Sequence, residues 1–379
     1  MPNAGQTLDD NPEKAHETST GHRVALLPGD GVGPEVIAAA RAVLEQVARL
    51  DGGVSLRFEV LPWGSAYYLE HGRMAPASFL RELGGFDAIL LGAVGDPRVP
   101  DHESLWGLLL PVRQHFDQYV NLRPIRLLPG VKSPISGLRP GAVDMLFVRE
   151  NTEGEYAGKG ASLYQGTERE VALQIGVFSR HGVERVVRFA FEQGRRLGRS
   201  VTSISKGNAL NFSGVFWDRV FHEVAEEYPD VEQRSYLVDA AALYMVQDPS
   251  RFGVVVASNL FGDILTDLGA GIVGGLGLAA SANLNPERRY PSMFEPVHGS
   301  APDLAGTGKA NPVAAIWAGA MMLEHLGYPR WGDAVLHAVE SVLAAGKTTP
   351  PDLGGSSSTE EVADAVTRQL TLAAEQAGL

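Results

Sequence analysis

Three arginines are spaced so that together they could hold a small acid. Arg113, Arg123 and Arg149 each carry a planar guanidinium, which can pair with a carboxylate through two hydrogen bonds. Arg149 ends an apolar stretch that predicts a strand, and the strand ends of parallel sheets face ligands. Arg123 falls in the motif NLRP, which predicts a turn. Two hypotheses remain: ordinary surface arginines, which spacing alone favours, and a clamp for two carboxylates, which is the more specific.

Two aspartates four residues apart could share a cation. The stretch SNLFGDILTDLG predicts a helix that carries Asp263 and Asp267 on one face. Stacked carboxylates repel each other unless a cation lies between them, and Asp239 as a third carboxylate would complete an oxygen site suited to Mg²⁺ or Mn²⁺. The buried side of this helix is expected to be formed by Ile264, Leu265 and Leu268. A solvated acidic face explains the pair about equally well, and the scarcity of other charges on the helix favours the metal.

A lysine and a tyrosine could move protons. Lys206 follows a predicted strand at 201–205, and a lysine at a strand end beside a cation can have its pKa lowered and act as a base. Tyr156, in RENTEGEYAG, could pass a proton to an enolate. An exposed lysine and a packed tyrosine are the default explanations, because neither residue is informative alone.

The segment EPVHGSAPDLAGTGKANP, residues 295–312, is typical of a binding loop. Its glycines let the backbone approach a ligand, and Asp303 could accept hydrogen bonds from a ribose diol. Its HGS triplet lacks the GxSxG elbow of a serine hydrolase. The glycine-rich PGDGVGPE near the N-terminus has Pro34 and Glu35 where GxGxxG needs its last spacer and glycine, so a Rossmann fingerprint is rejected.

Composition excludes several other classes. The 379 residues suggest about two domains, and a net charge of −13 argues against a nucleic-acid partner. The absence of cysteine excludes disulfides, thiolate metal sites and cysteine nucleophiles, and fits a cytoplasmic location. The polar residues 1–21 resemble no targeting peptide and are expected to form a disordered tail. The least polar run, 268–282, is too short and glycine-rich to span a membrane.

Alternating strands and helices are predicted to position these residues on a parallel α/β sheet. Strands are expected at residues 23–27, 54–60, 87–91, 143–149, 201–205, 234–238 and 253–257. Helices are expected at 36–50, from 66 onward, at 181–199, and in a mainly helical C-terminal third at 313–327, at 331–345 and after an N-cap at Thr359. Residues 151–174 have little helical period, and they predict an irregular or hairpin arm that clasps a second subunit.

Taken in order, these stretches resemble the β-decarboxylating dehydrogenases, a family that includes 3-isopropylmalate, isocitrate, homoisocitrate, tartrate and D-malate dehydrogenases. The resemblance extends from Arg23 to Leu370. The tartrate and D-malate branch is most similar in WGSAYYLEHGRMAP, DHESLWGLLLPVRQHFDQYVNLRP, RENTEGEY and SANLNPERRYPSMFEPVHGSAPD. The stretch SISKGNALNFSGVFWDRVF is less typical of that branch, which leaves the side chain of the substrate open.

The resemblance implies roles in binding. Arg113, Arg123 and Arg149 match the arginines that hold the malate moiety. Leu109, with its neighbours Trp106 and Leu110, lies where the family recognises the substituent at carbon 3. The residues that match the cofactor site are Glu295, His298, Gly299, Ser300, Ala301, Asp303 and Asn311. Asp303 implies NAD, because a carboxylate would repel the 2′-phosphate of NADP.

The resemblance also implies roles in catalysis. Asp263 and Asp267 match metal ligands, and Asp239 matches the ligand that a second subunit supplies. Lys206 matches the general base, also contributed across the dimer, and Tyr156 matches the proton donor. The implied ions are Mn²⁺ or Mg²⁺, with K⁺ as a further candidate.

The implied fold is α/β with the two domains of isopropylmalate and isocitrate dehydrogenases, not a Rossmann fold. Residues 22–118 and 276–379 would form a large cofactor-binding domain, and 119–275 a smaller one that carries the arm and builds a homodimer with shared active sites. The implied reaction is NAD- and metal-dependent oxidation, usually with decarboxylation, of a small (2R)-2-hydroxy acid such as D-malate or tartrate. The alternatives are a 3-isopropylmalate-type or specialised biosynthetic dehydrogenase for a larger 3-substituted malate and, more remotely, a non-catalytic regulatory subunit or an acid- or metal-binding protein without redox chemistry.

Overall fold

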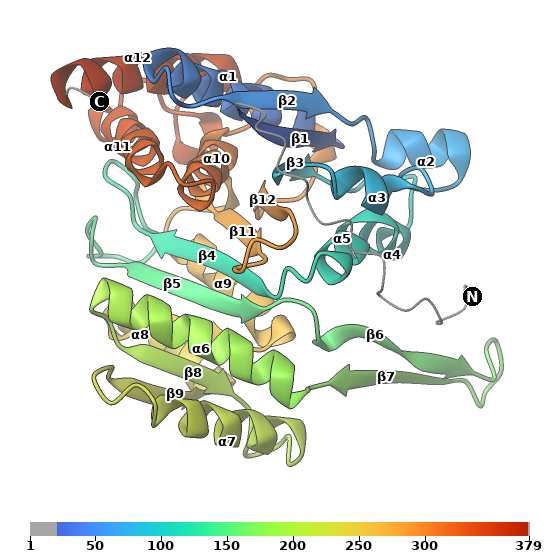
Figure 1. Cartoon of the computed structure of the whole chain (residues 1–379). Helices are drawn as coiled ribbons and strands as arrows, with labels where there is room; N and C mark the ends of the chain where they lie inside the picture. The colour runs from blue at the N-terminus through green and yellow to red at the C-terminus, as the bar shows by residue number, and fades with distance from the viewer. Residues whose placement is uncertain (1–20, 378–379) are drawn as a thin grey trace.

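A long sheet flanked by helices runs through the molecule. The computed structural model describes residues 21–377, so the predicted disordered tail lies outside the described residues except for Gly21. Figure 1 shows the blue N-terminal and red C-terminal segments side by side at one end, and the green middle of the chain at the other. The two ends of the described chain therefore build one half together.

Twelve strands are present among the described residues. They are β1 (His22–Gly29), β2 (Leu56–Val60), β3 (Ala88–Ala93), β4 (Val120–Arg126), β5 (Asp144–Glu150), β6 (Gly154–Leu163), β7 (Val171–Val177), β8 (Val201–Ser205), β9 (Gln233–Leu237), β10 (Val254–Ala257), β11 (Ala280–Leu284) and β12 (Ser292–Pro296). Every predicted strand is confirmed to within two residues at its ends. The strands β4, β6, β7, β11 and β12 were not predicted individually, and β11 and β12 interrupt the expected helical C-terminal third.

The helices of the same segment fall into three kinds. The α-helices are α1 (Gly33–Leu50), α2 (Ser65–His71), α3 (Phe79–Leu83), α4 (Asp101–Ser104), α5 (Leu110–His115), α6 (Arg180–Leu197), α7 (Ser213–Ala225), α8 (Val238–Gln247), α9 (Asn259–Ile272), α10 (Val313–His325), α11 (Pro329–Ala345) and α12 (Thr359–Ala377). The 3₁₀ turns are η2 (Pro249–Arg251), η3 (Leu276–Leu278), η4 (Pro302–Leu304) and η5 (Pro351–Leu353). One π-helical turn, η1 (Leu105–Leu109), joins α4 to α5. No helix between residues 21 and 377 is long and apolar enough to cross a lipid bilayer.

The main sheet is mixed, so the expectation of a parallel sheet was wrong at its centre. Ten strands follow the order β2-β1-β3-β12-β11-β4-β5-β10-β8-β9. The outer pairs are parallel, but β11 runs antiparallel to both β12 and β4, and β4 runs antiparallel to β5. Parallel strands at either end come from strand–helix–strand units, whereas the centre is built from segments that meet without an intervening helix.

The strand order keeps the two predicted domains apart along the sheet. The block β2-β1-β3-β12-β11 comes from residues 22–118 and 276–379, and the block β4-β5-β10-β8-β9 comes from residues 119–275. The division into two domains remains a prediction, but the boundary would fall between β11 and β4.

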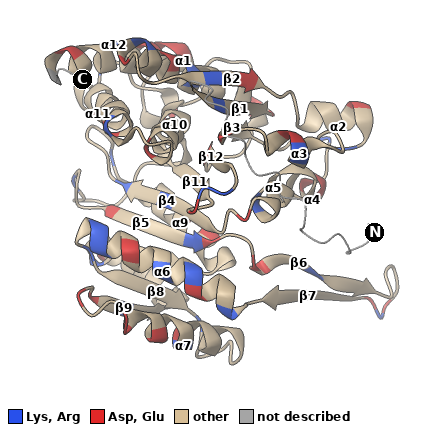
Figure 2. Cartoon of the chain, in the orientation of Figure 1, with Lys and Arg blue, Asp and Glu red and all other residues tan. Residues whose placement is uncertain are grey.

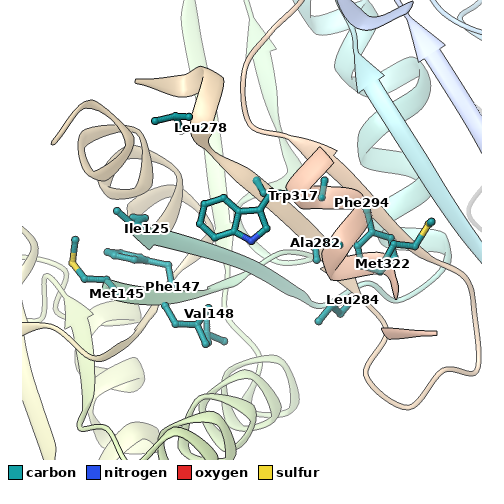
Figure 3. Close-up of a cluster of buried hydrophobic side chains, with 14 of the residues drawn as sticks. Ile125, Met145, Phe147, Val148, Leu278, Ala282, Leu284, Phe294, Trp317 and Met322 are labelled. Carbon is teal, nitrogen blue, oxygen red and sulfur yellow. The ribbon is translucent and has the colours of Figure 1, made fainter. Parts of the chain in front are cut away.

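The core of the first block centres on α10, a helix apolar on all sides. Ten of its thirteen residues are buried, as expected for a helix covered on every face. It packs against α1, α11 and β12. Figure 3 shows Trp317 of α10 among Phe294, Ala282 and Met322, which ties this helix to the central strands.

The start of α12 corrects one predicted cap. The Ser358 hydroxyl accepts from the Glu361 backbone N–H at 3.1 Å, and the Glu361 carboxylate accepts from the Ser358 N–H at 2.8 Å. This reciprocal pair is a capping box, so the N-cap is Ser358 and the expected cap at Thr359 was wrong. The Thr359 hydroxyl instead donates to the Ala310 carbonyl at 2.7 Å and anchors the helix to the loop before α10.

The predicted arm is a β-hairpin that projects from the body of the molecule (Figure 1). Its strands β6 and β7 form a separate two-stranded sheet, with an irregular register between Gly154 and Lys159. Every residue of β7 is exposed, including the large apolar side chains of Leu173 and Ile175. Figure 2 shows, in contrast, the outward face of α6 covered with basic and acidic residues, as is typical of a surface meeting water.

Candidate active site

The three arginines converge on one cleft. Arg113 lies in α5, Arg123 in β4 and Arg149 near the end of β5, as predicted for Arg149. Their side chains are only 7%, 7% and 2% exposed. The cleft has a volume of about 1310 Å³, and Tyr156 and Asp263 also line it. The alternative hypothesis, that these three residues are ordinary surface arginines, is therefore excluded.

The turn predicted at Arg123 was wrong. NLRP lies inside β4, where Pro124 pairs opposite Leu146 of the antiparallel neighbour β5. Proline is uncommon in a central strand, and this rule misdirected the prediction. The strand matters for the site, because alternate residues of β4 point to opposite faces and Arg123 points into the cleft.

Arg149 is fixed by two side chains of α9. Its Nε and Nη2 donate to Asn259 Oδ1 at 3.1 and 2.7 Å, and its Nη1 donates to Asp263 Oδ1 at 2.5 Å. Helix α9 comes this close because of Gly262, where an added Cβ would lie 2.7 Å from the Arg149 Cγ. Burial, and then the nearby charge of Arg123, lowers the pKa of Arg149 to about 9.

Arg123 and Arg113 are held in the same way. Arg123 Nε donates to Asn121 Oδ1 at 2.8 Å and its Nη1 donates to Thr266 Oγ1 at 2.6 Å. Arg113 Nη2 donates to Glu295 Oε1 at 2.8 Å. Burial also lowers the pKa of Arg123. Three buried guanidiniums, each with further donor groups, make this end of the cleft suited to binding carboxylates of a ligand.

The two aspartates lie on one face of α9, as predicted, and face these arginines. Asp263 Oδ1 is 3.4 Å from Arg123 Nη2, and Asp267 Oδ1 is 3.8 Å from Arg123 Nη1. Burial raises the pKa of Asp263, but the charges of Arg149 and Arg123 outweigh it and leave that pKa below its usual range. At Asp267 burial dominates and raises the pKa. The carboxylate nearer the arginines is therefore the more firmly ionised of the two.

The rest of α9 corrects the predicted buried side. Leu265 is buried and Leu268 half-buried, as expected, but the Ile264 side chain is exposed. The inner face consists of Gly262, Leu265, Thr266 and Gly269. Small residues line it because β4 and β5 approach closely: a Cβ at position 269 would lie 2.4 Å from the Ile125 Cδ1.

Tyr156 belongs to the same cluster. Its hydroxyl donates to Asp263 Oδ2 at 3.1 Å, and the Arg149 guanidinium carbon lies 5.7 Å from the centre of its ring. Burial, followed by the charge of Asp263, raises the pKa of Tyr156. The phenol therefore stays protonated and can act as a proton donor.

Lys206 and Asp239 pair with each other and not with this cluster. Lys206 Nζ lies 2.6 Å from Asp239 Oδ1, and this contact lowers the pKa of Asp239. Within the described part of one chain, no three acidic or histidine side chains gather closely enough to hold a metal ion. Asp239, Asp263 and Asp267 are therefore not brought together by a single chain.

Of the segment 295–312, only residues 295–299 line the cleft. Glu295, His298 and Gly299 line it together with the arginines. Burial lowers the pKa of His298, and its Nε2 is buried without a hydrogen-bond partner among the described residues. Ser300 is buried, Asp303 is exposed, and Asn311 Nδ2 donates to Asp352 at 3.0 Å.

The segment PGDGVGPE, which is not a Rossmann fingerprint, is hydrogen-bonded to this loop. Val32 N–H donates to the Ser300 carbonyl at 2.8 Å, and Gly306 N–H donates to Glu35 Oε1 at 2.6 Å. Ala301 adopts a left-handed φ of 39°, a strained conformation for a residue with a Cβ. Strain held in place by surrounding contacts is typical of ligand loops.

Leu109 lies on the wall of the cleft opposite the hairpin. It ends the π-helical turn η1, and Leu105 and Trp106 of the same turn line the cleft with it. π-helical turns are rare and often occur at functional sites, so this wall is unusual in backbone as well as in composition.

Sequence reasoning missed a buried polar network that orients the arginines. Asn121 Nδ2 donates to Asn283 Oδ1 at 2.7 Å, and Asn283 Nδ2 donates to Glu295 Oε1 at 2.7 Å. Through it Arg123 and Arg113 share one chain of hydrogen bonds across β4, β11 and β12. The sequence did contain a signal: NLRP and SANLN place asparagines, whose side chains are polar amides, within otherwise apolar strand sequence.

Comparison with known proteins identifies the family of this chain. D-malate dehydrogenase [decarboxylating] of Escherichia coli (strain K12) is 50% identical over 352 residues, 91% of this chain and 97% of the relative. Tartrate dehydrogenase/decarboxylase of Pseudomonas putida is 48% identical over 357 residues, 92% of this chain and 97% of the relative. The crystal structure of isocitrate dehydrogenase from Methylococcus capsulatus superposes with a TM-score of 0.83 at 37% identity and covers 92% of this chain and 99% of that one. Residues 23–366 match the family described as isocitrate/isopropylmalate dehydrogenase. This chain belongs to the isocitrate/isopropylmalate dehydrogenase family, whose fold it shares.

Proposed function

We propose that this enzyme oxidises a small (2R)-2-hydroxy acid with two carboxylates, such as D-malate or tartrate, and releases one carboxylate as CO₂. The observation that carries the proposal is the set of three buried guanidiniums at one end of the cleft. Planar guanidiniums that line a cleft can each pair with a carboxylate of a ligand through two hydrogen bonds. A four-carbon diacid supplies two such charges within reach of one cluster. The relatives named for D-malate and tartrate support the same substrate class.

The donor set fits a divalent cation and a dinucleotide. Asp263 and Asp267 offer hard oxygen ligands that in this chain face guanidiniums and, at Asp263, the Tyr156 hydroxyl, and the solvent-facing Asp239 offers a third. The buried, unpartnered Nε2 of His298 suits a polar group of a nucleotide. Asp303 would repel a 2′-phosphate, which favours NAD over NADP. When bound, the cation supplies charge that acidifies a hydroxyl, and NAD⁺ supplies the hydride acceptor.

The residues of the chain would divide the remaining work. The arginines bind the carboxylates and fix the acid against the wall formed by Leu109. Lys206 Nζ, released from Asp239, accepts the proton of the 2-hydroxyl. Tyr156, kept protonated by its raised pKa, returns a proton to the carbon that has lost CO₂.

We infer that a second copy of the chain completes each site. Lys206 and Asp239 lie apart from Tyr156 and Asp263, so one chain alone does not assemble the set. Large apolar side chains are exposed on α8, on α9 and on the hairpin: Leu243, Val246, Ile264, Leu173 and Ile175. Such surface is typical of an interface between subunits. The arm would then clasp the partner.

The cleft also favours a second candidate, a dehydrogenase for malates with a larger substituent at carbon 3. The wall formed by Leu105, Trp106 and Leu109 is apolar and partly exposed, which suits a hydrocarbon group. The same reaction would then act on an acid of the 3-isopropylmalate kind.

A screen of acids tests the proposal. NADH formation would be measured with Mn²⁺ and K⁺ for D-malate, L- and meso-tartrate, 3-isopropylmalate, isocitrate and homoisocitrate, with CO₂ release measured in parallel. We expect the highest kcat/KM with D-malate or a tartrate, and we expect Lys206→Ala to lose at least about 100-fold of it. Lys347→Ala, an exposed lysine remote from the cleft, is the matched control. No turnover of any acid, or a Lys206→Ala variant as active as the control, would overturn the proposal.

A further inference from the structure

One asparagine behind the cleft connects a substrate-facing arginine to the root of the hairpin. Asn259, the first residue of α9, is 2% exposed and is not among the residues that line the cleft. Its Oδ1 accepts hydrogen bonds from Nε and Nη2 of Arg149, and its Nδ2 donates to the Glu153 carbonyl at 3.0 Å. The two ends of one amide therefore hold two different segments of the chain.

The acceptor end of the amide leaves part of the Arg149 guanidinium open. A guanidinium has five N–H groups. Asn259 accepts from Nε and from Nη2, and Asp263 accepts from Nη1. One N–H on each terminal nitrogen remains without a partner among the described residues, and such a pair can bind a carboxylate. The amide orients the arginine in this way without adding a charge that would compete with the acid.

The donor end of the amide holds the point where the hairpin leaves the main sheet. Glu153 lies between the end of β5 and the start of β6, three residues before Tyr156. Its carboxylate accepts from the backbone N–H and the hydroxyl of Ser179, the N-cap of α6, at 2.8 and 2.6 Å. Figure 1 shows β6 leaving beside β5 and β7 returning to α6, so Glu153 fastens both ends of the hairpin. Holding Glu153 therefore helps to fix the position of Tyr156.

Two glycines allow the amide to reach both segments. A Cβ at Gly154 would lie 3.2 Å from the Asn259 Cβ, and Gly154 has a φ of +71°. A Cβ at Gly262 would lie 2.7 Å from the Arg149 Cγ. The first turn of α9 thus packs closely against the hairpin root and against Arg149. The bridge is supported by close backbone packing and does not depend on flexible side chains alone.

We propose that Asn259 is a positioning residue that fixes the Arg149 guanidinium, which binds a carboxylate of the acid, relative to the Tyr156 phenol, which returns the proton. The inference rests on the proposed function and adds a residue that lies behind the cleft. Asn259 also precedes Asp263 by one helical turn, and both Arg149 and Tyr156 donate hydrogen bonds to Asp263. Loss of the amide would therefore let the arginine and the tyrosine move relative to each other, and a displacement of about 1 Å is enough to lower turnover.

Two variants break the bridge in different ways. Asn259→Asp keeps an acceptor for Arg149 but loses the donor to Glu153 and adds a competing charge, whereas Asn259→Ala removes both ends. We expect KM for the preferred acid to rise roughly 5- to 150-fold in both variants, the scale of a buried polar group left without its partner. KM for NAD⁺ should change less, because the amide holds no part of the segment 295–299.

The proton step gives a second readout. The ratio of kcat in H₂O to kcat in D₂O reports how far proton transfer limits turnover. A displaced Tyr156 should slow protonation, so we expect this ratio to be larger in both variants than in wild type. Neither the ratio nor KM depends on the fraction of the enzyme that folds, so a loss of stability cannot imitate the result.

Asn285→Asp is the matched control. Asn285 is also buried and does not line the cleft. Its Nδ2 donates to the Asp117 carbonyl at 3.1 Å, and its Oδ1 accepts from the Arg289 backbone N–H at 2.9 Å. The control therefore undergoes the same chemical change at a second buried amide, and it should keep the wild-type KM and isotope ratio.

The outcomes separate this inference from the proposed function. Wild-type enzyme that oxidises none of the acids overturns the proposed function, and the role of Asn259 with it. Wild-type enzyme that oxidises an acid, with both Asn259 variants matching Asn285→Asp in KM, overturns the role of Asn259 alone. A raised KM with the wild-type isotope ratio also overturns it, because the connection to Tyr156 would then be absent.

Discussion

The front and rear faces of the central sheet use the same strands for opposite purposes. On β4, β5 and β12 the residues Arg123, Arg149 and Glu295 point to the front cleft. Leu122 and Phe294, the immediate neighbours of Arg123 and Glu295, and Leu146, three residues before Arg149, line a groove of about 590 Å³ on the rear. Successive residues of a strand face opposite sides, so one set of backbone segments supplies both surfaces.

The two faces treat arginine differently. The rear groove is also lined by arginines, but Arg126 pairs with Glu340 at 3.0 Å and Arg199 with Asp144 at 2.5 Å. These pairs lie at the rim, where the Arg126 and Arg199 side chains are 35% and 30% exposed and stay in contact with water. The groove is also lined by apolar residues, among them Trp317, which Figure 3 shows within the buried hydrophobic cluster.

The difference shows where this fold accepts a loss of stability. Desolvating a guanidinium costs several kcal/mol unless geometry and partners are excellent, and replacing such groups by apolar residues is often neutral or stabilising. The front face nevertheless buries three: Asn121 and Asn283 connect Arg123 to Arg113, and Asn259 holds Arg149. The rear face follows the ordinary rule, with apolar residues inside and paired charges at the rim. The front face therefore has the pattern of a binding site and the rear face that of a structural seam.

The largest expected effect separates two arginines of β4. Arg123→Met should lower kcat/KM for the preferred acid by roughly 30- to 5,000-fold, because truncating a buried charged hydrogen-bonding partner costs about 2–5 kcal/mol. Its free energy of unfolding is measured as well, because Asp263 and Asp267 lose a neighbouring guanidinium in this variant. Arg126→Met, three residues along the same strand but on the rear face, should change kcat/KM by less than about threefold. Steady-state kinetics and urea unfolding of both variants check this comparison.

Equal losses of activity in the two variants would remove the distinction between the faces. Loss of cooperative urea unfolding in Arg123→Met would show that its lost activity reflects lost structure, in which case the arginine would be a structural element of the sheet.

The sequence could predict which residues share one face of a helix or strand, but not which other segments pack against that face. The four-residue spacing of Asp263 and Asp267 correctly placed both on one helical face, and the strand before Lys206 was correctly located. Which side of that helix is buried depends on what packs against it, so Ile264 was assigned to the core although it is exposed. The residues next to Ile264 in the sequence would be the same whether its side chain were buried or exposed, so the sequence alone could not decide between the two.

The centre of the sheet shows the same limit. The motif NLRP predicted a turn, yet β4 pairs with β5 at Pro124 and with β11 at residues 120–122. The asparagine network was invisible for a related reason: Asn121 and Asn283 are 162 residues apart, and only the fold makes them neighbours. The functional aspartates and arginines could be nominated from their types, whereas the groups that orient them could not.

A smaller effect is expected from the titration of His325 on the rear face. Its ring packs against Phe294 at 5.6 Å, and burial, aided by the charge of Arg288, lowers its pKa from 6.5 to about 4. Between these values the unfolded chain binds a proton that the folded chain does not, so stability is full above about pH 6.5 and falls as the pH drops toward about 4. Wild-type protein should lose about 1–2 kcal/mol of unfolding free energy from this group between about pH 7 and about pH 5.

Urea unfolding of His325→Gln at both pH values isolates that contribution. The variant should lose the corresponding part of the pH dependence, whereas His102→Gln, an exposed histidine on α4, should keep the wild-type behaviour. At about pH 7 the activity of His325→Gln should match wild type, because the rear face takes no part in binding the acid. A large loss of turnover at that pH would instead connect the rear groove to the cleft.

The smallest effect concerns the ion pair that spans the rear groove from α6 to α10. Arg196 Nη1 lies 3.5 Å from Glu324 Oε1, and the side chains are 55% and 56% exposed. Water screens such a pair, so a double-mutant cycle of Arg196→Met and Glu324→Gln should give a coupling of about 0–1 kcal/mol that decreases further at high salt. Unfolding free energies of the four proteins at low and high salt measure it. A salt-insensitive coupling above about 2 kcal/mol would mean that the rear charges are desolvated like those of the front. The two faces would then differ in degree only, and the argument that burial of arginine marks the substrate site would lose its basis.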